Sequence, residues 1–492
     1  MSLKEYYDAI DKMGMYETWC RLMQNAPCLP DIGELYEMGL AHVSKEGKKM
    51  FGKYYTPHDV ATLMAKWLVK LEGENVCDVC CGVGNLVMAY LRELGLVEAR
   101  KLVLAGKVWL YDVDGLAARI CIESMAKVFG QDLRNHVHLM TGDFLNKDTH
   151  LPPNAKVISN PPYAKASFDT GSWVQTPVIK DTKEMYCAIL EKIMDESRSF
   201  VAITPQNFLG REKFKELRKK MDDHSGFIIP FDNTPGQVFN GRKHGVFNTN
   251  TQNQVRPAIT VCDNNPMQRG FKVAGMVRFK NEERDGVLVP SYLEGFVGDT
   301  PQRTPNGERY AKCFPQLENL LLRWRQSAGK ERFKDHISPD GECCLNFVTT
   351  CRYHTVAYVS DLFRSGKRIM KFKDEETRDL AYCWLNSSFC YWHWRLYDGE
   401  ITYQQGMLDE MPTFFNKLSE DTKNILVGIA REMQALEQSH IVRKKNSGKM
   451  MESIRFPKDC RTKINNLLLL ELGVECDGHD FDLIHAHSVV DV

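Results

Sequence analysis

The sequence has no apolar run of about 18 residues, the length that a membrane-spanning helix needs, so we expect no membrane span. Its first residues, Met1–Tyr7, contain no apolar signal core. The 16 cysteines are scattered, and no pair of CxxC units or Cys/His cluster has zinc-ligand spacing. We therefore expect reduced, mostly buried thiols, no metal site and a cytoplasmic location.

The chain also has no excess of charge, since 64 Lys and Arg residues balance 64 Asp and Glu residues. A neutral total neither supports nor excludes a nucleic-acid partner, because the distribution of charge decides binding. The 492 residues are too many for one compact core, so two or three domains are expected.

The pattern of apolar residues divides the chain into four regions. Residues 1–50 have helical spacing and predict a helical N-terminal cap, whereas residues 51–265 alternate short apolar runs with amphipathic stretches. Such alternation predicts an α/β domain with a mainly parallel sheet. Residues 266–415 mix short strands, loops and aromatics without a clear period, and residues 416–492 predict a C-terminal helical region with a basic, flexible stretch from Arg443.

Within the second region, five short apolar runs predict strands and three amphipathic stretches predict helices. The predicted strands are Asn75–Val79, Lys107–Tyr111, Val137–Thr141, Lys156–Ser159 and Ser199–Thr204. The predicted helices are Asp59–Leu71, Leu86–Leu94 and Leu116–Phe129. Parallel sheets of this kind bind ligands at the carboxyl ends of their strands, so we expect the ligand-binding residues to come directly after the strands.

A glycine turn follows the first predicted strand: Asp78 opens it, and Gly82 and Gly84 would let a ligand approach the backbone. Asp112 ends the second strand, and a carboxylate there suits both hydroxyls of a ribose. After the third strand, Asp143-Phe144 places an acceptor beside an aromatic ring, which suits an adenine. Together these strand ends predict a nucleoside pocket; with only a GxG, the turn fits a pyrophosphate poorly.

The fourth predicted strand leads into the tetrapeptide Asn160-Pro161-Pro162-Tyr163. Its prolines remove two N–H donors, so the turn offers acceptors, the Asn160 side-chain oxygen and the Pro161 carbonyl, beside an aromatic ring. The amino group of a nucleobase has two hydrogens to donate, and its lone pair is delocalised into a flat ring. Acceptors that hold these hydrogens would favour a pyramidal nitrogen, which is transition-state stabilisation rather than strong-base catalysis. In isolation, the tetrapeptide would also fit a surface turn.

A third motif, Gly52–Pro57, precedes the first strand. The three motifs in this order resemble those of the gamma-class amino-methyltransferases of restriction–modification systems, which carry a GxYYTP-like segment, a DPACGSGxF-like loop and NPPY. The loop departs from that pattern at Val79 and Val83, where the family has Pro and Ser. The resemblance covers about residues 50–260. It implies a Rossmann-like S-adenosylmethionine-dependent methyltransferase sheet at 51–265 and a mixed α+β target-recognition domain for DNA at 266–415.

The resemblance also implies a role for each matching residue. Thr56 and the loop backbone would hold the methionine part of S-adenosylmethionine, Asp78 its ammonium group, Asp112 its ribose, and Asp143 with Phe144 its adenine. The expected cofactor residues are Tyr55, Thr56, Pro57, Asp78, Cys81, Gly82, Gly84, Asp112, Asp143, Phe144 and Asn160. The expected catalytic residues are Asn160, Pro161, Pro162 and Tyr163.

A later segment, Gly236–Gly241, is similar to a VFxG element of the same family. There an aromatic residue stacks on the target base, so we expect Phe239 and Tyr163 to stack on its two faces; a core position is the alternative for Phe239. A base inside a duplex must first be flipped out to reach such a pocket.

For DNA recognition, the basic residues of the C-terminal half are candidates to contact phosphates or guanine edges, although each would also fit an ordinary charged surface. They are Arg303, Arg309, Arg323, Arg325, Arg352, Arg368, Lys371 and Lys373. The segment Arg443–Lys463 would be either a backbone clamp or a linker.

The expected activity is therefore site-specific methylation of adenine N6 in double-stranded DNA by a prokaryotic or phage protein. Pro339-Asp340-Gly341-Glu342 lacks the lysine of a PD…ExK nuclease site, so we expect no fused nuclease, and any restriction endonuclease would be a separate chain. We expect a monomer or a weak dimer. The alternatives are cytosine-N4 methylation of DNA, methylation of protein glutamine or RNA, and a non-enzymatic DNA- or partner-binding protein that retains the cofactor fold.

Overall fold

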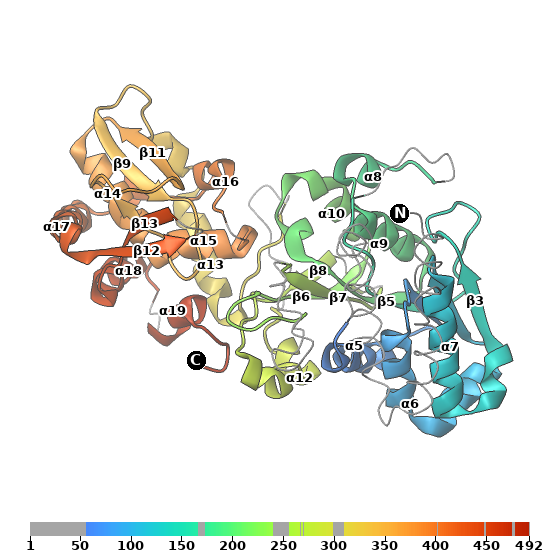
Figure 1. Cartoon of the computed structure of the whole chain (residues 1–492). Helices are drawn as coiled ribbons and strands as arrows, with labels where there is room; N and C mark the ends of the chain where they lie inside the picture. Colours follow the sequence, from blue (N-terminus) through green and yellow to red (C-terminus); the bar gives the residue numbers. More distant parts are fainter. Residues whose placement is uncertain are drawn as a thin grey trace. The chain divides into compact units, whose positions relative to one another are not determined.

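A computed structural model describes residues 56–165, 173–239, 255–298 apart from 266 and 269, 309–474 apart from 401, 447 and 448, and 478–491. The predicted helical cap at 1–50 and the segment Gly52–Tyr55 lie outside the described residues. The chain divides into two compact units, Met1–Gln302 and Arg303–Val492, and each is described by itself (Figure 1).

In the first unit, eight strands among the described residues form one sheet in the order β3-β2-β1-β4-β5-β7-β6-β8. Neighbouring strands are parallel except that β7 runs antiparallel to both β5 and β6. The strands are β1 Asn75–Val79, β2 Val108–Asp112, β3 Val137–Thr141, β4 Ala155–Ser159, β5 Ser199–Pro205, β6 Ser225–Pro230, β7 Pro257–Cys262 and β8 Gly270–Val273. This mainly parallel sheet confirms the predicted α/β class.

The strands of the sheet centre form because their apolar runs can be covered on both faces. Every residue of β4 is buried, and so is every residue of β5 except its last. A strand of this kind reads as a continuous apolar run rather than an alternating one. All five strands predicted from the sequence are present, with ends that differ by at most one residue.

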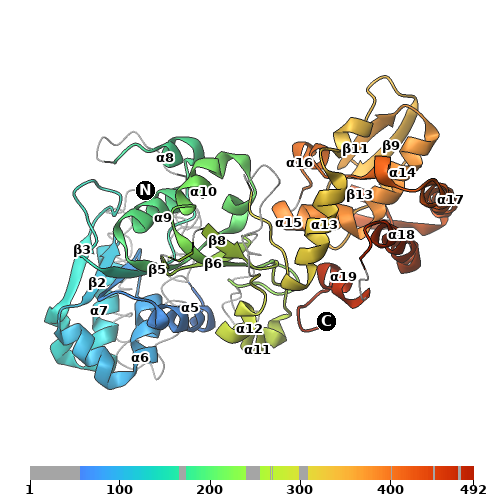
Figure 2. The ribbon, with the colours of Figure 1, turned by 180° about the vertical axis from the view of Figure 1, so that it is seen from behind.

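Helices cover both faces of the sheet: α5, α6 and α7 lie on one face and α9 and α10 on the other (Figures 1 and 2). Helix α6 is interrupted at Gly95 (φ 77°, ψ 162°), so the predicted helix that ends at Leu94 covers only its first part. The helices are α5 His58–Lys70, α6 Asn85–Leu104, α7 Gly115–Phe129, α8 Pro177–Thr182, α9 Met185–Glu196, α10 Lys215–Met221, α11 Arg284–Val287 and α12 Pro290–Glu294.

The first unit extends further along the chain than the predicted boundary between residues 265 and 266. Strand β8 lies beyond that boundary, yet it pairs in parallel with β6 and forms the edge of the same sheet. Helices α11 and α12 also belong to this unit, which ends at Gln302. A strand of four residues is too short to give a recognisable period, and this explains why the sequence did not reveal it.

The second unit combines a three-stranded antiparallel sheet, in the order β10-β9-β11, with a separate hairpin and several helices. Its strands are β9 Cys343–Val348, β10 Ala357–Tyr358, β11 Lys367–Phe372, β12 Ile441–Asn446 and β13 Lys449–Ile454. Its helices are α13 Glu318–Ala328, α14 Glu375–Asn386, α15 Ser388–Tyr397, α16 Gln405–Asp409, α17 Glu420–Leu436, α18 Lys458–Glu471 and α19 Gly478–His485.

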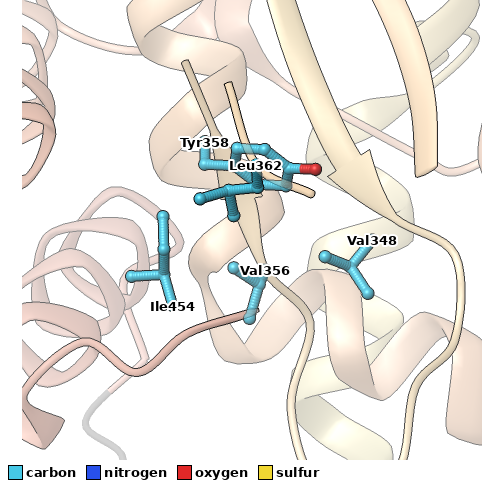
Figure 3. Packing of buried hydrophobic residues seen from close by; sticks show 5 residues of the cluster. All are labelled: Val348, Val356, Tyr358, Leu362 and Ile454. Atoms are coloured by element: carbon cyan, nitrogen blue, oxygen red, sulfur yellow. The ribbon is translucent and has the colours of Figure 1, made fainter. Parts of the chain in front are cut away.

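The basic stretch from Arg443, predicted to be flexible, forms the hairpin β12–β13 instead. The hairpin is anchored because Ile454 is fully buried in an apolar cluster, against which Ile441 also packs. Figure 3 shows this cluster, which consists of Val348, Val356, Tyr358, Leu362 and Ile454. The linker interpretation of this stretch is therefore wrong.

Within the described residues, no helix is long and apolar enough to cross a membrane, and no group of three or more His, Cys, Asp or Glu side chains is placed to hold a metal ion. The described cysteines are free thiols, and most of them are buried. Burial also raises the pKa of several of these thiols, such as Cys262, whose pKa rises to about 12.

Candidate active site

The glycine turn and the tetrapeptide lie side by side because β1 and β4 are neighbours in the sheet. Val79, the last residue of β1, is paired in register with Ser159, the last residue of β4. The Ser159 hydroxyl also donates a hydrogen bond to the Val79 carbonyl (2.6 Å). At this point the strand order changes direction, from β1-β2-β3 on one side to β4-β5 on the other. Parallel α/β sheets bind their ligands at such a switch point.

Thr56 connects the three sequence motifs. It is buried, its backbone carbonyl accepts a hydrogen bond from the Asn85 side chain (3.0 Å), and its hydroxyl accepts one from the Asn160 side chain (3.0 Å). Asn85 is the first residue of α6, directly after the glycine turn. Thr56 precedes α5, in which the Ala61 amide donates to the Pro57 carbonyl (2.9 Å). The structure thus brings together motifs that lie up to 104 residues apart in the sequence.

The turn after β1 has a backbone that requires glycine. Gly82 and Gly84 both have positive φ angles (53° and 87°), and so does Cys80 (63°). A Cβ atom on Gly84 would lie 2.2 Å from the Cys121 sulfur, so a larger residue would be excluded by packing as well as by conformation. Cys81 is buried, and its amide donates to the Tyr111 carbonyl (3.0 Å). The turn therefore presents backbone rather than side chains to a ligand.

Asp78 is fully buried beneath this turn. Its Oδ2 atom accepts a hydrogen bond from the amide of Val87 in α6 (3.0 Å), whereas its Oδ1 atom has no hydrogen-bond partner. Burial, together with the nearby carboxylate of Asp112, raises the pKa of Asp78 well above its usual value. A buried carboxylate oxygen without a donor is costly, and a cationic ligand group would supply one.

Asp112 ends β2 and holds the turn in place. Its two carboxylate oxygens accept hydrogen bonds from the amides of Gly82 (2.7 Å) and Asp114 (2.8 Å). Each oxygen can accept a second bond, so this carboxylate can still serve ribose hydroxyls. The ribose role of Asp112 stays a prediction, and the structure adds a function in shaping the turn.

Asp143 and Phe144 follow β3, as predicted, but other protein groups already contact both side chains. Asp143 accepts hydrogen bonds from the Leu145 amide (2.9 Å) and from the Trp173 indole (2.6 Å). Phe144 is buried; its ring lies edge-on to Tyr111, with centroids 5.3 Å apart. Trp173 thus contacts the carboxylate that is expected to lie beside the adenine. This contact could not be predicted from the sequence, because Trp173 is an isolated aromatic residue in a loop.

The tetrapeptide at 160–163 lies beyond the end of β4. Pro161 is buried, while Asn160, Pro162 and Tyr163 are partly exposed. The Asn160 amide nitrogen is committed to Thr56, and this fixes the orientation of its oxygen. Tyr163 is fixed by its hydroxyl, which donates to the Ile203 carbonyl at the end of β5 (3.1 Å).

Tyr163 and Phe239 meet, but not as parallel plates. Their ring centroids are 6.1 Å apart and their planes are inclined by 69°. A base that stacks on both would need the two planes nearly parallel and slightly further apart. The structure confirms that the two rings are neighbours; a two-sided stack would require one of them to turn.

The basic residues predicted to contact DNA differ in their surroundings. The Arg323 guanidinium donates to the Gly473 carbonyl (2.9 Å), that of Arg325 donates to the Tyr397 hydroxyl (2.6 Å), and that of Arg368 pairs with Asp409 (2.8 Å). These contacts give the three side chains structural roles. Side chains alternate between the two faces of a strand, and in β11 the face opposite Arg368 is the exposed one. Lys371, and Lys373 just beyond the strand, are exposed; Arg303 lies outside the described residues.

Residues 30–225 match the model of the N-6 DNA methylase family. This match covers less than half of the chain. The match includes the glycine turn and the tetrapeptide, and it confirms the resemblance to N6-adenine methyltransferases of restriction–modification systems. No curated protein matches the sequence.

Among solved structures, the chain is similar to three restriction–modification proteins. The first is a chain of the DrdV–DNA complex, with 15% identity and a TM-score of 0.42; the match covers 56% of this chain and 32% of that one. The second is the M protein of the type I restriction enzyme EcoKI, with 14% identity and a TM-score of 0.36; the match covers 58% of this chain and 63% of that one. The third is the methyltransferase subunit of a type I system from Streptococcus thermophilus, with 16% identity and a TM-score of 0.33; the match covers 51% of this chain and 52% of that one. The chain thus spans less than two thirds of the length of each.

Proposed function

We propose that this chain transfers a methyl group from S-adenosylmethionine to the N6 amino group of an adenine that has been flipped out of double-stranded DNA. The observation that carries the proposal is the hydrogen bond from Asn160 to Thr56. It joins the tetrapeptide that would hold the amine to the segment that would hold the cofactor. The family match over residues 30–225 supports the same reaction.

The residues around the turn fit S-adenosylmethionine. Asp78 offers a buried oxygen without a donor to the ammonium group, the turn offers backbone at Gly82 and Gly84, and Asp112 offers acceptors to the ribose. Asp143 and Trp173 would frame the adenine. When bound, the sulfonium supplies an electrophilic methyl group.

Asn160 would act on the target amine by holding it. Its side-chain nitrogen donates to Thr56, and in this proposal its side-chain oxygen accepts one amino hydrogen while the Pro161 carbonyl accepts the other. This grip makes the nitrogen pyramidal and directs its lone pair at the methyl group. The nitrogen–methyl bond forms as the sulfur–methyl bond breaks, and the sulfur leaves as a neutral thioether. The cationic, acidic nitrogen then loses one proton to water, so no strong base is needed.

Base flipping costs a few kcal/mol, and the aromatic residues beside Asn160 would offset part of that cost. Tyr163 is held by its hydroxyl and provides a fixed face. Phe239 would turn from its edge-on contact to cover the other face of the base. Exposed lysines of the second unit, Lys371 and Lys373, are the candidates for phosphate contacts, and we propose that this unit reads the target sequence.

The test is the incorporation of a labelled methyl group from S-adenosylmethionine into DNA that lacks methylated adenine. The DNA is then digested to nucleosides, which are separated, and a second sample is sequenced for modified bases. The proposal expects the label in N6-methyladenosine at one short sequence. Label in N4-methylcytosine would replace adenine by cytosine as the target, and label only in added RNA or protein would refute DNA as the substrate.

A further inference from the structure

Arg284, the first residue of α11, joins two segments on either side of the proposed target site. Its guanidinium forms a two-pronged ion pair with Asp59 in the first turn of α5 (Nε to Oδ2 2.7 Å, Nη2 to Oδ1 2.9 Å). The same group donates to the carbonyls of Gln237 and Val238, the latter at 3.2 Å. It also lies 5.7 Å from the centre of the Phe279 ring.

The segment that Arg284 holds leads directly to Phe239. Val238 is almost fully buried, and the Gly236 amide donates to the Phe279 carbonyl (2.8 Å). A Cβ atom on Gly236 would lie 2.4 Å from that carbonyl oxygen, so the two backbones are in close contact. Arg284 thus holds the carbonyls of Gln237 and Val238, the two residues that directly precede Phe239 in the chain.

The other partner of Arg284 belongs to the cofactor side. Asp59 lies three residues after Thr56, whose hydroxyl receives the Asn160 hydrogen bond. Helix α5 is itself firmly placed, since its residues Val60, Leu63, Met64 and Leu68 are buried. Arg284 therefore ties a loop to a fixed helix, and the loop is the part that its loss would release.

We propose that Arg284 is a positioning residue for methyl transfer: it sets the place of Phe239 relative to Thr56 and Asn160. This inference rests on the proposed function, since it concerns the same site. Arg284 itself touches neither the base nor the cofactor in this role. Its effect is on the rate of the chemical step, because a displaced aromatic ring leaves the flipped base misaligned with the methyl group.

The contacts at residue 284 require the planar, forked geometry of a guanidinium group. Four hydrogen bonds run from one side chain to a carboxylate and two carbonyls. A lysine would keep the charge, but its compact ammonium group cannot reproduce the planar, two-pronged geometry. A phosphate contact is the competing role for an arginine near DNA. It would depend on charge alone, so Arg284→Lys separates the two.

The chain offers a matched control in Arg100, on the far part of α6. Its guanidinium forms the same kind of two-pronged pair with Asp132 (3.1 and 2.7 Å) and also donates to a backbone carbonyl, that of Phe129. Neither residue belongs to the site. Arg100→Gln thus removes comparable contacts without touching the segment before Phe239.

The experiment compares Arg284→Gln, Arg284→Lys, Asp59→Asn and Arg100→Gln with the wild type. Single-turnover methyl transfer to DNA is measured at saturating cofactor and DNA, and S-adenosylhomocysteine affinity by calorimetry. We expect both Arg284 variants to lose on the order of 10²-fold in rate. Their cofactor Kd should stay within about threefold, a change of less than 1 kcal/mol. Asp59→Asn should lose less, and its combination with Arg284→Gln should add nothing to the loss from Arg284→Gln.

Amide hydrogen exchange in the full chain supplies a readout that does not need activity. Exchange in the segment 231–239 should rise in Arg284→Gln and stay unchanged in Arg100→Gln. Unchanged exchange, equal rate losses in the Arg284 and Arg100 variants, or full rescue by lysine would each overturn the positioning role. Absence of methyl transfer by the wild type would refute the proposed function instead, and the exchange measurement would still decide whether Arg284 holds the loop.

Discussion

Replacing Asp78 by asparagine tests whether the buried carboxylate under the glycine turn is kept for a cationic ligand. The substitution preserves size and still leaves an oxygen for the Val87 amide. It removes the negative charge from Oδ1, the atom that has no donor. We therefore expect the variant to fold, and to lose affinity for ligands that carry the ammonium group.

The magnitude follows from the one bond that is lost. A hydrogen bond to a charged group contributes about 1.5–3 kcal/mol, which corresponds to a weakening of roughly 10- to 150-fold in Kd. The loss should be near the upper end, because Asp78 is fully buried and the asparagine NH2 group would oppose a cation if it turned toward it.

The assay is calorimetric titration with two ligands. S-adenosylhomocysteine carries the ammonium group, whereas methylthioadenosine has the same nucleoside without it. Asp78→Asn should weaken the first by the factor above and leave the second within about threefold of the wild type. Equal losses for both ligands, or no loss for either, would show that Asp78 does not face the ammonium group.

The role of Asp78 also predicts the direction in which stability and ligand affinity change with pH. Burial raises the pKa of Asp78, so the native state binds a proton more readily than the unfolded chain does. Its contribution to stability therefore decreases as the pH rises from about 4, the usual pKa, through the raised value. Without ligand, Asp78→Asn should be at least as stable as the wild type at neutral pH, and thermal unfolding will check this. Wild-type affinity for S-adenosylhomocysteine should increase over the same pH range, whereas that of the variant should not.

Four further substitutions test other parts of the site. Asn160→Ala should reduce methyl transfer on the order of 10²–10³-fold while leaving cofactor affinity within about threefold; full activity in the labelled-methyl assay would remove Asn160 from the catalytic group. Gly84→Ala should cost at least about 1–2 kcal/mol in urea unfolding because of its left-handed backbone, and the added Cβ meets Cys121 at 2.2 Å. Cys121→Ala should recover part of that loss, and a Gly84→Ala variant as stable as the wild type would contradict the packing argument. Trp173→Phe removes the indole bond to Asp143 and should weaken S-adenosylhomocysteine binding severalfold, by about 1 kcal/mol; unchanged affinity would place Trp173 outside the cofactor site.

The parts of the fold that the sequence predicts well are those whose pattern is local. Strands β1, β4 and β5 are short apolar runs buried on both faces, and their bounds follow from the run itself. The glycine turn and the tetrapeptide are also contiguous, so their placement follows once the strand order is known.

The helices α14 and α15 show what a local pattern cannot reveal. Every residue of α15 is buried, and so is every residue of α14 from Asp379 onward. A helix that is buried all round has no polar face, and therefore no amphipathic period to recognise. The region was predicted as strands, loops and aromatics for that reason.

Contacts between distant residues are the other part that sequence reasoning missed. Asn85 and Trp173 carry no motif of their own, and Arg284 lies 225 residues from Asp59. Arg325 looked like a surface cation, but its guanidinium is bonded to Tyr397. Only the folded chain places such pairs together, so their roles could not be assigned beforehand.

The burial of Ile454 among residues of the earlier sheet has a consequence for synthesis of the chain. Val348 and Ile454 belong to one apolar cluster, but the ribosome adds Ile454 after more than 100 further residues. At a synthesis rate of about 5–20 residues per second, the cluster stays incomplete for roughly 5–20 s. During that interval its apolar side chains have no cover, and a nascent second unit is then a substrate for chaperones. A fragment that stops at residue 415 would remain permanently in this state.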